Sequence, residues 1–199
     1  MRVDACLYGY IGLAFSAWAR FLVKPLIPVD PRLSSGLRDE LAAIYKQVMW
    51  LSRQPGTSAG NARAWYTHIM AETVKRRIRQ FSGMVSQAAV SSEESTLRLE
   101  HYKRIQTTLT ALVERHRKLK RPRPEEFIAT VLECERVHIV TFKENYEAMQ
   151  AKGNYRKARI VLLPWKSIAP SRQAELWSKM LRGRVANAKS YAPGAEGGA

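Results

Sequence analysis

Three segments of the chain decide the fold that the sequence predicts: LRDELAAIYKQVMWL (37–51), NARAWYTHIMAETVKRRIRQFSGMVSQ (61–87) and ESTLRLEHYKRIQTTLTALVERHRKL (94–119). Within each segment, mostly apolar residues recur at steps of three or four, which places them on one face of a helix. The third helix must end before Pro122 and Pro124. The segments therefore predict a mainly α fold, an antiparallel three-helix bundle around one apolar seam.

The composition indicates an anionic partner. The chain has 199 residues, a hydrophobic content of 46% and a formal net charge of +16, with a sequence pI near 10.2. A charge of this size attracts nucleic acid, an anionic lipid surface or an acidic protein. Aspartate occurs only at residues 4, 30 and 39. Most two-metal phosphoryl-transfer sites rely on aspartate to hold their cations, so such chemistry is disfavoured.

No set of residues with catalytic spacing stands out. Cys6 and Cys134 are far apart and fit neither a zinc motif nor a disulfide framework. His101 and His116 would share a helix face about 22 Å apart, which is too far for one metal ion. We therefore predict that the protein is not an enzyme and binds neither a metal nor a cofactor directly.

The segments that flank the bundle differ in character. Residues 1–36 hold an apolar stretch followed by a proline-rich connector, and the stretch is shorter than a membrane-spanning helix needs. Three interpretations stay open: a helix at the inner membrane, an uncleaved mitochondrial targeting segment, or a helix packed inside a larger complex. Residues 191–199 form a Gly/Ala-rich tail that we expect to be flexible.

Residues 122–190 predict a small, basic α/β extension. The predicted elements are a helix over 125–133, a strand over 137–141, a helix opened by a Thr141–Glu144 capping box, a strand over 160–163 and a helix from Pro170. With only two strands the extension would lean on the bundle, residues 37–121, or on a neighbouring subunit.

One family resemblance follows from these residues. The first helix carries the triplet Ile44-Tyr45-Lys46, and the second ends in a basic run that leads to Phe81. The pattern resembles the LYR family of small mitochondrial three-helix proteins over residues 37–121. Members of that family typically bind the mitochondrial acyl carrier protein, whose acyl-4′-phosphopantetheine arm slides between the helices.

The resemblance implies a docking face and a tunnel. The residues that would contact the acidic carrier protein are Tyr45, Lys46, Lys75, Arg76, Arg79, Lys103 and Arg104. Those that would line the acyl-chain tunnel are Leu41, Val48, Met70, Val74, Ile78, Phe81, Ile105, Leu109 and Leu112. Exposed ion pairs contribute only about 0.2–1 kcal/mol each, so the fatty chain would supply more, at about 0.8 kcal/mol per buried methylene. The same apolar side chains would equally suit a dry bundle core.

Two functional hypotheses follow. The first is a non-catalytic accessory or assembly subunit of a large mitochondrial complex, with respiratory complex I ranked first. It would lie on the matrix side of the inner membrane and contact acyl carrier protein, other subunits and cardiolipin. The alternative is a basic RNA-contacting subunit of the mitochondrial ribosome or another nucleic-acid-binding protein. Residues 115–123 contain no acid, and Tyr155, Trp165, Trp177 and Tyr191 lie among cations and could stack on bases.

Overall fold

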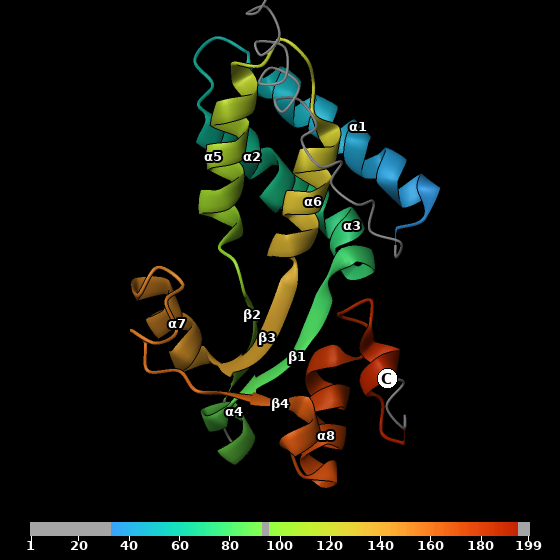
Figure 1. The fold of residues 1–199 in the computed structure, drawn as a ribbon, viewed down its shortest axis with the longest axis vertical. Helices are drawn as coiled ribbons and strands as arrows, with labels where there is room; N and C mark the ends of the chain where they lie inside the picture. The colour runs from blue at the N-terminus through green and yellow to red at the C-terminus, as the bar shows by residue number, and fades with distance from the viewer. Residues whose placement is uncertain (1–32, 93–95, 195–199) are drawn as a thin grey trace, which may run out of the picture.

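A computed structural model describes residues 33–92 and 96–194 of the chain. It shows an α/β fold in which a lobe of helices stands above a mixed four-stranded sheet (Figure 1). The prediction of a three-helix bundle is therefore wrong. The predicted apolar N-terminal segment lies outside the described residues. Among the residues that are described, no helix is long and apolar enough to cross a membrane.

The helical lobe combines segments from both halves of the chain. It contains α1 (Ser35–Ser52), α2 (Ala59–Trp65), a π-helical turn η1 (Tyr66–Met70), α3 (Ala71–Ile78), α5 (Ile105–Arg117) and α6 (Pro124–Cys134). The Ser34 hydroxyl accepts the Leu37 N–H and caps α1, as its position before the apolar stripe favours. The first predicted helix and the helix over 125–133 are thus confirmed, but α6 packs into the same core as α1.

The sheet also takes strands from both halves. Its strands are β1 (Gln80–Ser86), β2 (Leu97–His101), β3 (Arg136–Thr141) and β4 (Leu162–Pro164), in the order β2-β3-β1-β4. The central pair β1 and β3 is parallel, whereas β2 and β4 run antiparallel to their neighbours. Two strands come from the range predicted as bundle and two from the range predicted as extension, so the sheet joins the two ranges.

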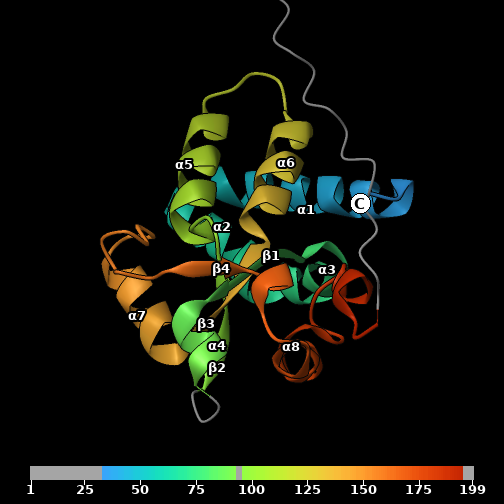
Figure 2. The ribbon, with the colours of Figure 1, turned by 60° about the horizontal axis from the view of Figure 1, so that its bottom comes forward.

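Shorter helices surround the sheet. They are α4 (Gln87–Ser91), α7 (Phe142–Gln150), η2 (Trp165–Ser167), α8 (Pro170–Leu176), a second π-helical turn η3 (Trp177–Leu181) and η4 (Ala188–Tyr191). In Figure 2, α7 and α8 lie on opposite sides of the sheet. Phe81, Val85 and Ile139 on one sheet face pack with Leu176 and Leu181 in a second apolar core. The predicted Thr141–Glu144 capping box is confirmed, and so is the helix start at Pro170.

Two of the three predicted bundle helices change structure partway along. The second ends at Ile78, because Arg79 adopts an extended conformation and the chain continues as β1. Gly83, with φ of +80°, lies at an irregularity in the pairing of β1 with β3. The first part of the third predicted helix is strand β2, and only α5 from Ile105 is helical. Phe81 and Val85 are four residues apart, a spacing that places them on one face of either a helix or a strand.

Candidate anion-binding site

Tyr45, the middle residue of the triplet, is buried in the helical lobe and already has partners. Its hydroxyl accepts the Arg123 N–H at 3.0 Å and lies 3.1 Å from His116 Nδ1, while His116 Nε2 is 3.0 Å from a Glu126 carboxylate oxygen. Burial lowers the pKa of His116, although the hydrogen bond and charge of Glu126 oppose this shift. The neutral ring can thus accept from Tyr45 and donate to Glu126. Tyr45 is 2% exposed and ties α1 to α5 and α6, so it offers nothing to a partner.

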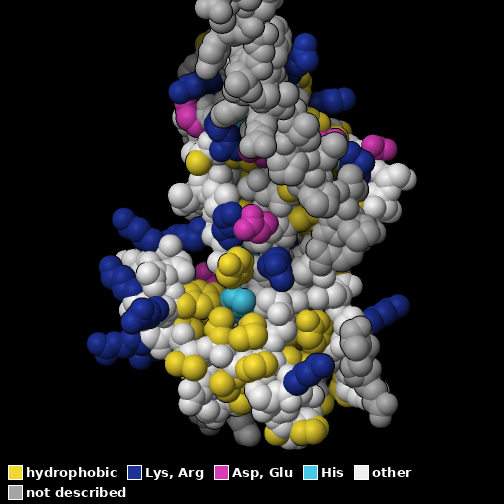
Figure 3. Space-filling model, viewed as in Figure 1, with side chains coloured by type: hydrophobic (Ala, Val, Ile, Leu, Met, Phe, Trp, Pro, Cys, Tyr) yellow, Lys and Arg dark blue, Asp and Glu magenta, His cyan; other side chains and the backbone are white. Residues whose placement is uncertain are grey.

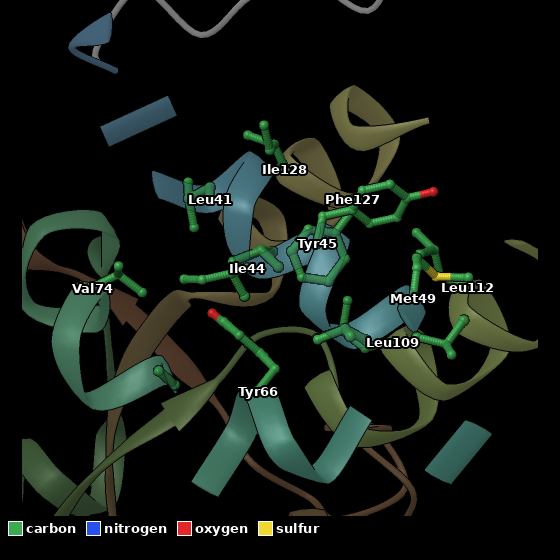
Figure 4. Close-up of a cluster of buried hydrophobic side chains, with 14 of the residues drawn as sticks. Leu41, Ile44, Tyr45, Met49, Tyr66, Val74, Leu109, Leu112, Phe127 and Ile128 are labelled. Carbon is green, nitrogen blue, oxygen red and sulfur yellow. The ribbon is translucent and has the colours of Figure 1, made fainter. Parts of the chain in front are cut away.

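The predicted tunnel residues pack against one another and against α6. Six of them are buried in the helical core: Leu41, Val48, Val74, Ile78, Leu109 and Leu112. Met70 and Ile105 pack at its edge. Figure 4 shows Phe127 and Ile128 of α6 beside Tyr45 and Leu41, where the bundle prediction had no fourth helix. The seam expected to receive an acyl chain therefore holds side chains of α6.

Phe81 belongs to the other core. Its ring contacts Trp165 and Tyr191 with centroid distances of 5.4 and 4.7 Å, and the Asn187 side chain hydrogen-bonds its backbone N–H and C=O. It lies on β1 because Arg79 ends α3 two residues earlier. The prediction that Phe81 lines a seam between helices is therefore wrong.

Three of the predicted docking residues converge on one pocket. Lys75, Arg76 and Arg79 lie at the C-terminal end of α3, and with β2 and η3 they border a cavity of about 220 Å³. The full lining is Lys75, Arg76, Arg79, Leu97, Arg98, Leu99, Met180 and Arg184. The pocket therefore has an apolar floor and a cationic rim, the combination that suits an anion with an apolar body.

Two of these cations have no acidic partner among residues 33–92 and 96–194. Lys75 forms an ion pair with Glu72, and Arg79 Nε is 2.9 Å from Glu135 Oε2. Arg76 and Arg184 form no ion pair within the described part of the chain and are exposed. Their charges are therefore free to meet an anion, and the planar guanidinium group matches phosphate or carboxylate oxygens.

A buried carboxylate holds Arg79 in place behind the rim. Glu135 is 2% exposed, and its Oε2 is also 3.5 Å from His101 Nε2. Burial would raise the pKa of Glu135, but the hydrogen bond from His101 and the charge of Arg79 outweigh it and lower the pKa. Glu135 thus stays ionised and fixes the Arg79 guanidinium, whereas Arg76 and Arg184 at the mouth have no such carboxylate partner among the described residues.

Arg98 borders the pocket through its position on β2, but its guanidinium group lies on the other face of the sheet. Successive side chains of a strand point to opposite faces, so Leu97 and Leu99 face the pocket and Arg98 faces away. The Arg98 guanidinium carbon lies 5.3 Å from the centroid of the Phe142 ring on α7. The cationic rim therefore consists of Lys75, Arg76, Arg79 and Arg184, which we call the cationic pocket.

The other predicted docking residues lie apart from this pocket. Lys46 is exposed on α1 in the helical lobe. Lys103 Nζ forms an ion pair with Glu133 at 2.8 Å, and Arg104 donates to the Met149 carbonyl at 2.8 Å. The structure thus brings together Lys75, Arg76 and Arg79 but does not bring Lys46, Lys103 and Arg104 to them.

Sequence reasoning missed the side of the pocket that comes from the C-terminal half. Met180 lies in the π-helical turn η3, and Arg184 follows Gly183, whose φ is +69°. π-Helical turns occur often at functional sites. The sequence signal was only the excess of basic residues between Lys152 and Lys189, which does not say which of them meets α3.

Comparisons with known proteins found no matching family model, no matching curated protein and no matching solved structure. The assignment of a function therefore rests on the geometry and charge of this chain.

Proposed function

We propose that the protein is a non-catalytic, RNA-binding protein that holds backbone phosphates at the cationic pocket. The single observation that carries this proposal is the convergence of Lys75, Arg76, Arg79 and Arg184 on one cavity, two of them without an acidic partner in the described ranges. Phosphate contacts dominate the affinity of such proteins, because each neutralised phosphate releases condensed counterions. The formal net charge of +16 adds long-range attraction.

The alternative with an acyl carrier protein has less support from the described residues. It requires a fatty chain to enter between the helices, where α6 now packs against α1. It also requires Tyr45 at the surface, whereas Tyr45 is bonded inside the lobe. Association with a mitochondrial complex and capture of acylated carrier protein remain predictions of the sequence, and RNA binding depends on neither.

The proposal is tested with the full chain and a fluorescein-labelled single-stranded RNA of about 20 nucleotides. We expect the logarithm of the association constant to fall linearly with the logarithm of salt concentration between about 50 and 200 mM, by about 0.7 per phosphate contact. Fluorescence anisotropy measures the association constant at each salt concentration, and these values give the slope. A parallel titration with acylated acyl carrier protein, at the same salt concentrations, tests the competing hypothesis.

Charge reversal locates the site. Arg76→Glu combined with Arg184→Glu should abolish most RNA binding, because it places two negative charges at the mouth of the cationic pocket. The matched control is Lys46→Glu with Arg53→Glu, two exposed cations on and just after α1 that have no ion pair within the part of the chain that is described. Equal loss in both double variants would mean that binding depends only on net charge. Tight capture of the carrier protein, sensitive to Lys46→Glu and without RNA affinity, would overturn the proposal.

A further inference from the structure

The sheet has a second face, opposite α8, which α7 and Tyr155 cover only in part. Alternation along the strands places Arg98, Glu100 and Tyr102 of the β2 segment on this face, and the register pairs Glu100 with His138 and Arg98 with Val140 on β3. Ser82 on β1 lies on the other side of His138, since Phe81 pairs with Val137 in the parallel ladder. We call these residues, with the adjoining Phe142, the open sheet face.

Large aromatic rings remain exposed at both ends of the open sheet face. Tyr102 is 56% exposed and Phe142 55% exposed. Phe142 begins α7 and carries the Arg98 guanidinium over its ring. Figure 3 shows hydrophobic side chains gathered over the lower, sheet-bearing part of the molecule, with Lys and Arg side chains projecting at its edge. This face therefore brings exposed rings and a cation together.

The exposed Tyr102 ring is held in place from below. It makes an edge contact with His138 at a centroid distance of 5.8 Å, and His138 contacts Tyr155 at 5.6 Å. His138 Nδ1 is in turn 2.5 Å from Ser82 Oγ. Burial, with a smaller contribution from the charge of Arg136, lowers the pKa of His138 to about 4, so the ring is neutral near pH 7. A supported ring loses little freedom when a ligand stacks on it.

The charges of this face favour a polyanion. Arg98 and Arg136 are exposed on the open sheet face. Glu100 is the acidic residue that lies between them. Glu100 is partly buried, and burial raises its pKa even though His101 and Arg104 oppose the shift. Aromatic rings between exposed arginines are the arrangement with which proteins bind single-stranded nucleic acid, because every base has a face that can stack.

We propose that the open sheet face stacks unpaired bases of an RNA strand on Tyr102 and Phe142, while Arg98 and Arg136 meet the adjacent phosphates. This inference rests on the proposed function and adds the substrate class, single-stranded rather than duplex RNA. Bases inside a duplex already stack on one another and cannot reach a protein ring. The cationic pocket lies on the opposite side of β2 and supplies contacts to the backbone.

Two alanine variants test the inference with the full chain. Tyr102→Ala and Phe142→Ala should each weaken binding of a single-stranded RNA by about 5- to 150-fold, the range for loss of one stacked base. Affinity for a blunt RNA duplex should be lower than for the single strand and unchanged in both variants. Tyr102→Phe should restore binding, because it keeps the ring and removes only the hydroxyl. Trp50→Ala is the matched control, since Trp50 is 66% exposed but lies on α1 in the helical lobe.

A strand with 2-aminopurine at single positions provides a direct readout, because stacking on a ring quenches its fluorescence. We expect quenching with the wild-type protein and its loss in Tyr102→Ala. Single-strand affinity unchanged in both alanine variants would overturn the open sheet face as a stacking site and leave the proposed function standing. Equal affinity for duplex and single strand would also overturn it. Absence of RNA binding by the wild-type protein would instead refute the proposed function and, with it, this inference.

Discussion

The helical lobe and the sheet use the same kinds of residue in opposite ways. In the lobe, Tyr45 and His116 are buried and bonded to one another, and Glu126 completes their hydrogen bonding. Around the sheet, Tyr102 after β2 is exposed, and Arg184 after η3 has no acidic partner within the described ranges. The difference arises because α6 covers the lobe's aromatic residues, whereas α7 leaves Tyr102 exposed on the open sheet face. A basic or aromatic residue in the sequence therefore indicates function only together with its neighbours in the fold.

The comparison predicts that the two apolar cores are equally important for stability. Phe127→Ala removes a ring that contacts Tyr45 and Tyr66, and Phe81→Ala removes one that contacts Trp165 and Tyr191. Each should lower the free energy of unfolding by about 3–5 kcal/mol. Urea denaturation followed by circular dichroism measures it.

The exposed Phe142 provides the control for both variants. Phe142→Ala should change the free energy of unfolding by less than about 0.5 kcal/mol, as is usual for surface substitutions. If Phe81→Ala were equally mild, the sheet would lack the packed core described above, and the contrast between a buried and an open face would be lost.

The buried His138 on β3 should make the stability of the protein depend on pH. Its pKa falls from 6.5 to about 4 on folding, so between these values the unfolded chain binds more protons. Stability is therefore complete above about pH 6.5 and is lost as the pH falls toward 4, by about 3 kcal/mol. His116, whose pKa is also lowered, contributes in the same direction.

The variant His138→Gln keeps a polar partner for Ser82 but cannot be protonated. Its free energy of unfolding should depend less steeply on pH between 6.5 and 4, and the remaining slope should come from His116 and the carboxylates. An unchanged slope in denaturation series at several pH values would mean that His138 is already solvated, and the support beneath Tyr102 would be absent.

A pair of tyrosine variants compares two buried hydroxyl groups inside the lobe. Tyr45→Phe leaves the Arg123 N–H and His116 Nδ1 without the Tyr45 hydroxyl and should cost about 1–3 kcal/mol. Tyr66→Phe should cost less than about 0.5 kcal/mol, because the Tyr66 hydroxyl is buried with no hydrogen-bond partner within the described ranges. Neither should alter RNA affinity. Weaker RNA binding by Tyr45→Phe, with folding intact, would return Tyr45 to the list of binding residues.

Local signals in the sequence predicted much of the C-terminal half. The capping box of Thr141 and Glu144, the proline at residue 170 and the β-branched run before Thr141 each act over a few residues and were read correctly. Strand β4 begins two residues later and ends one residue later than predicted, because Leu162–Pro164 pairs only with the C-terminal end of β1.

The failures came from residues whose spacing fits two structures. Phe81 and Val85 suit a helix or a strand, and β1 forms because β3 and β4 pair with it from more than 50 positions away in the sequence, as the pairs Phe81–Val137 and Met84–Pro164 show. Leu97 and Leu99 alternate with Arg98 and Glu100, as is typical of a strand. The helical spacing of the apolar residues that follow, in α5, led to the prediction of one long helix instead. The sequence predicted three of the four cations of the cationic pocket, because Lys75, Arg76 and Arg79 are close in sequence. Arg184 reaches it only through the tertiary fold.

The clearest effect on binding should come with only a small effect on stability. Arg76→Gln combined with Arg184→Gln removes two exposed charges, so the free energy of unfolding should change by less than about 1 kcal/mol in total. The measurement that tests the cationic pocket most directly is the salt dependence of RNA affinity in this variant, with Lys46→Gln and Arg53→Gln as the matched control. The slope should fall by about 1.4, at about 0.7 for each lost phosphate contact, while the control keeps the wild-type slope. A wild-type slope in the pocket variant would contradict phosphate binding at this site.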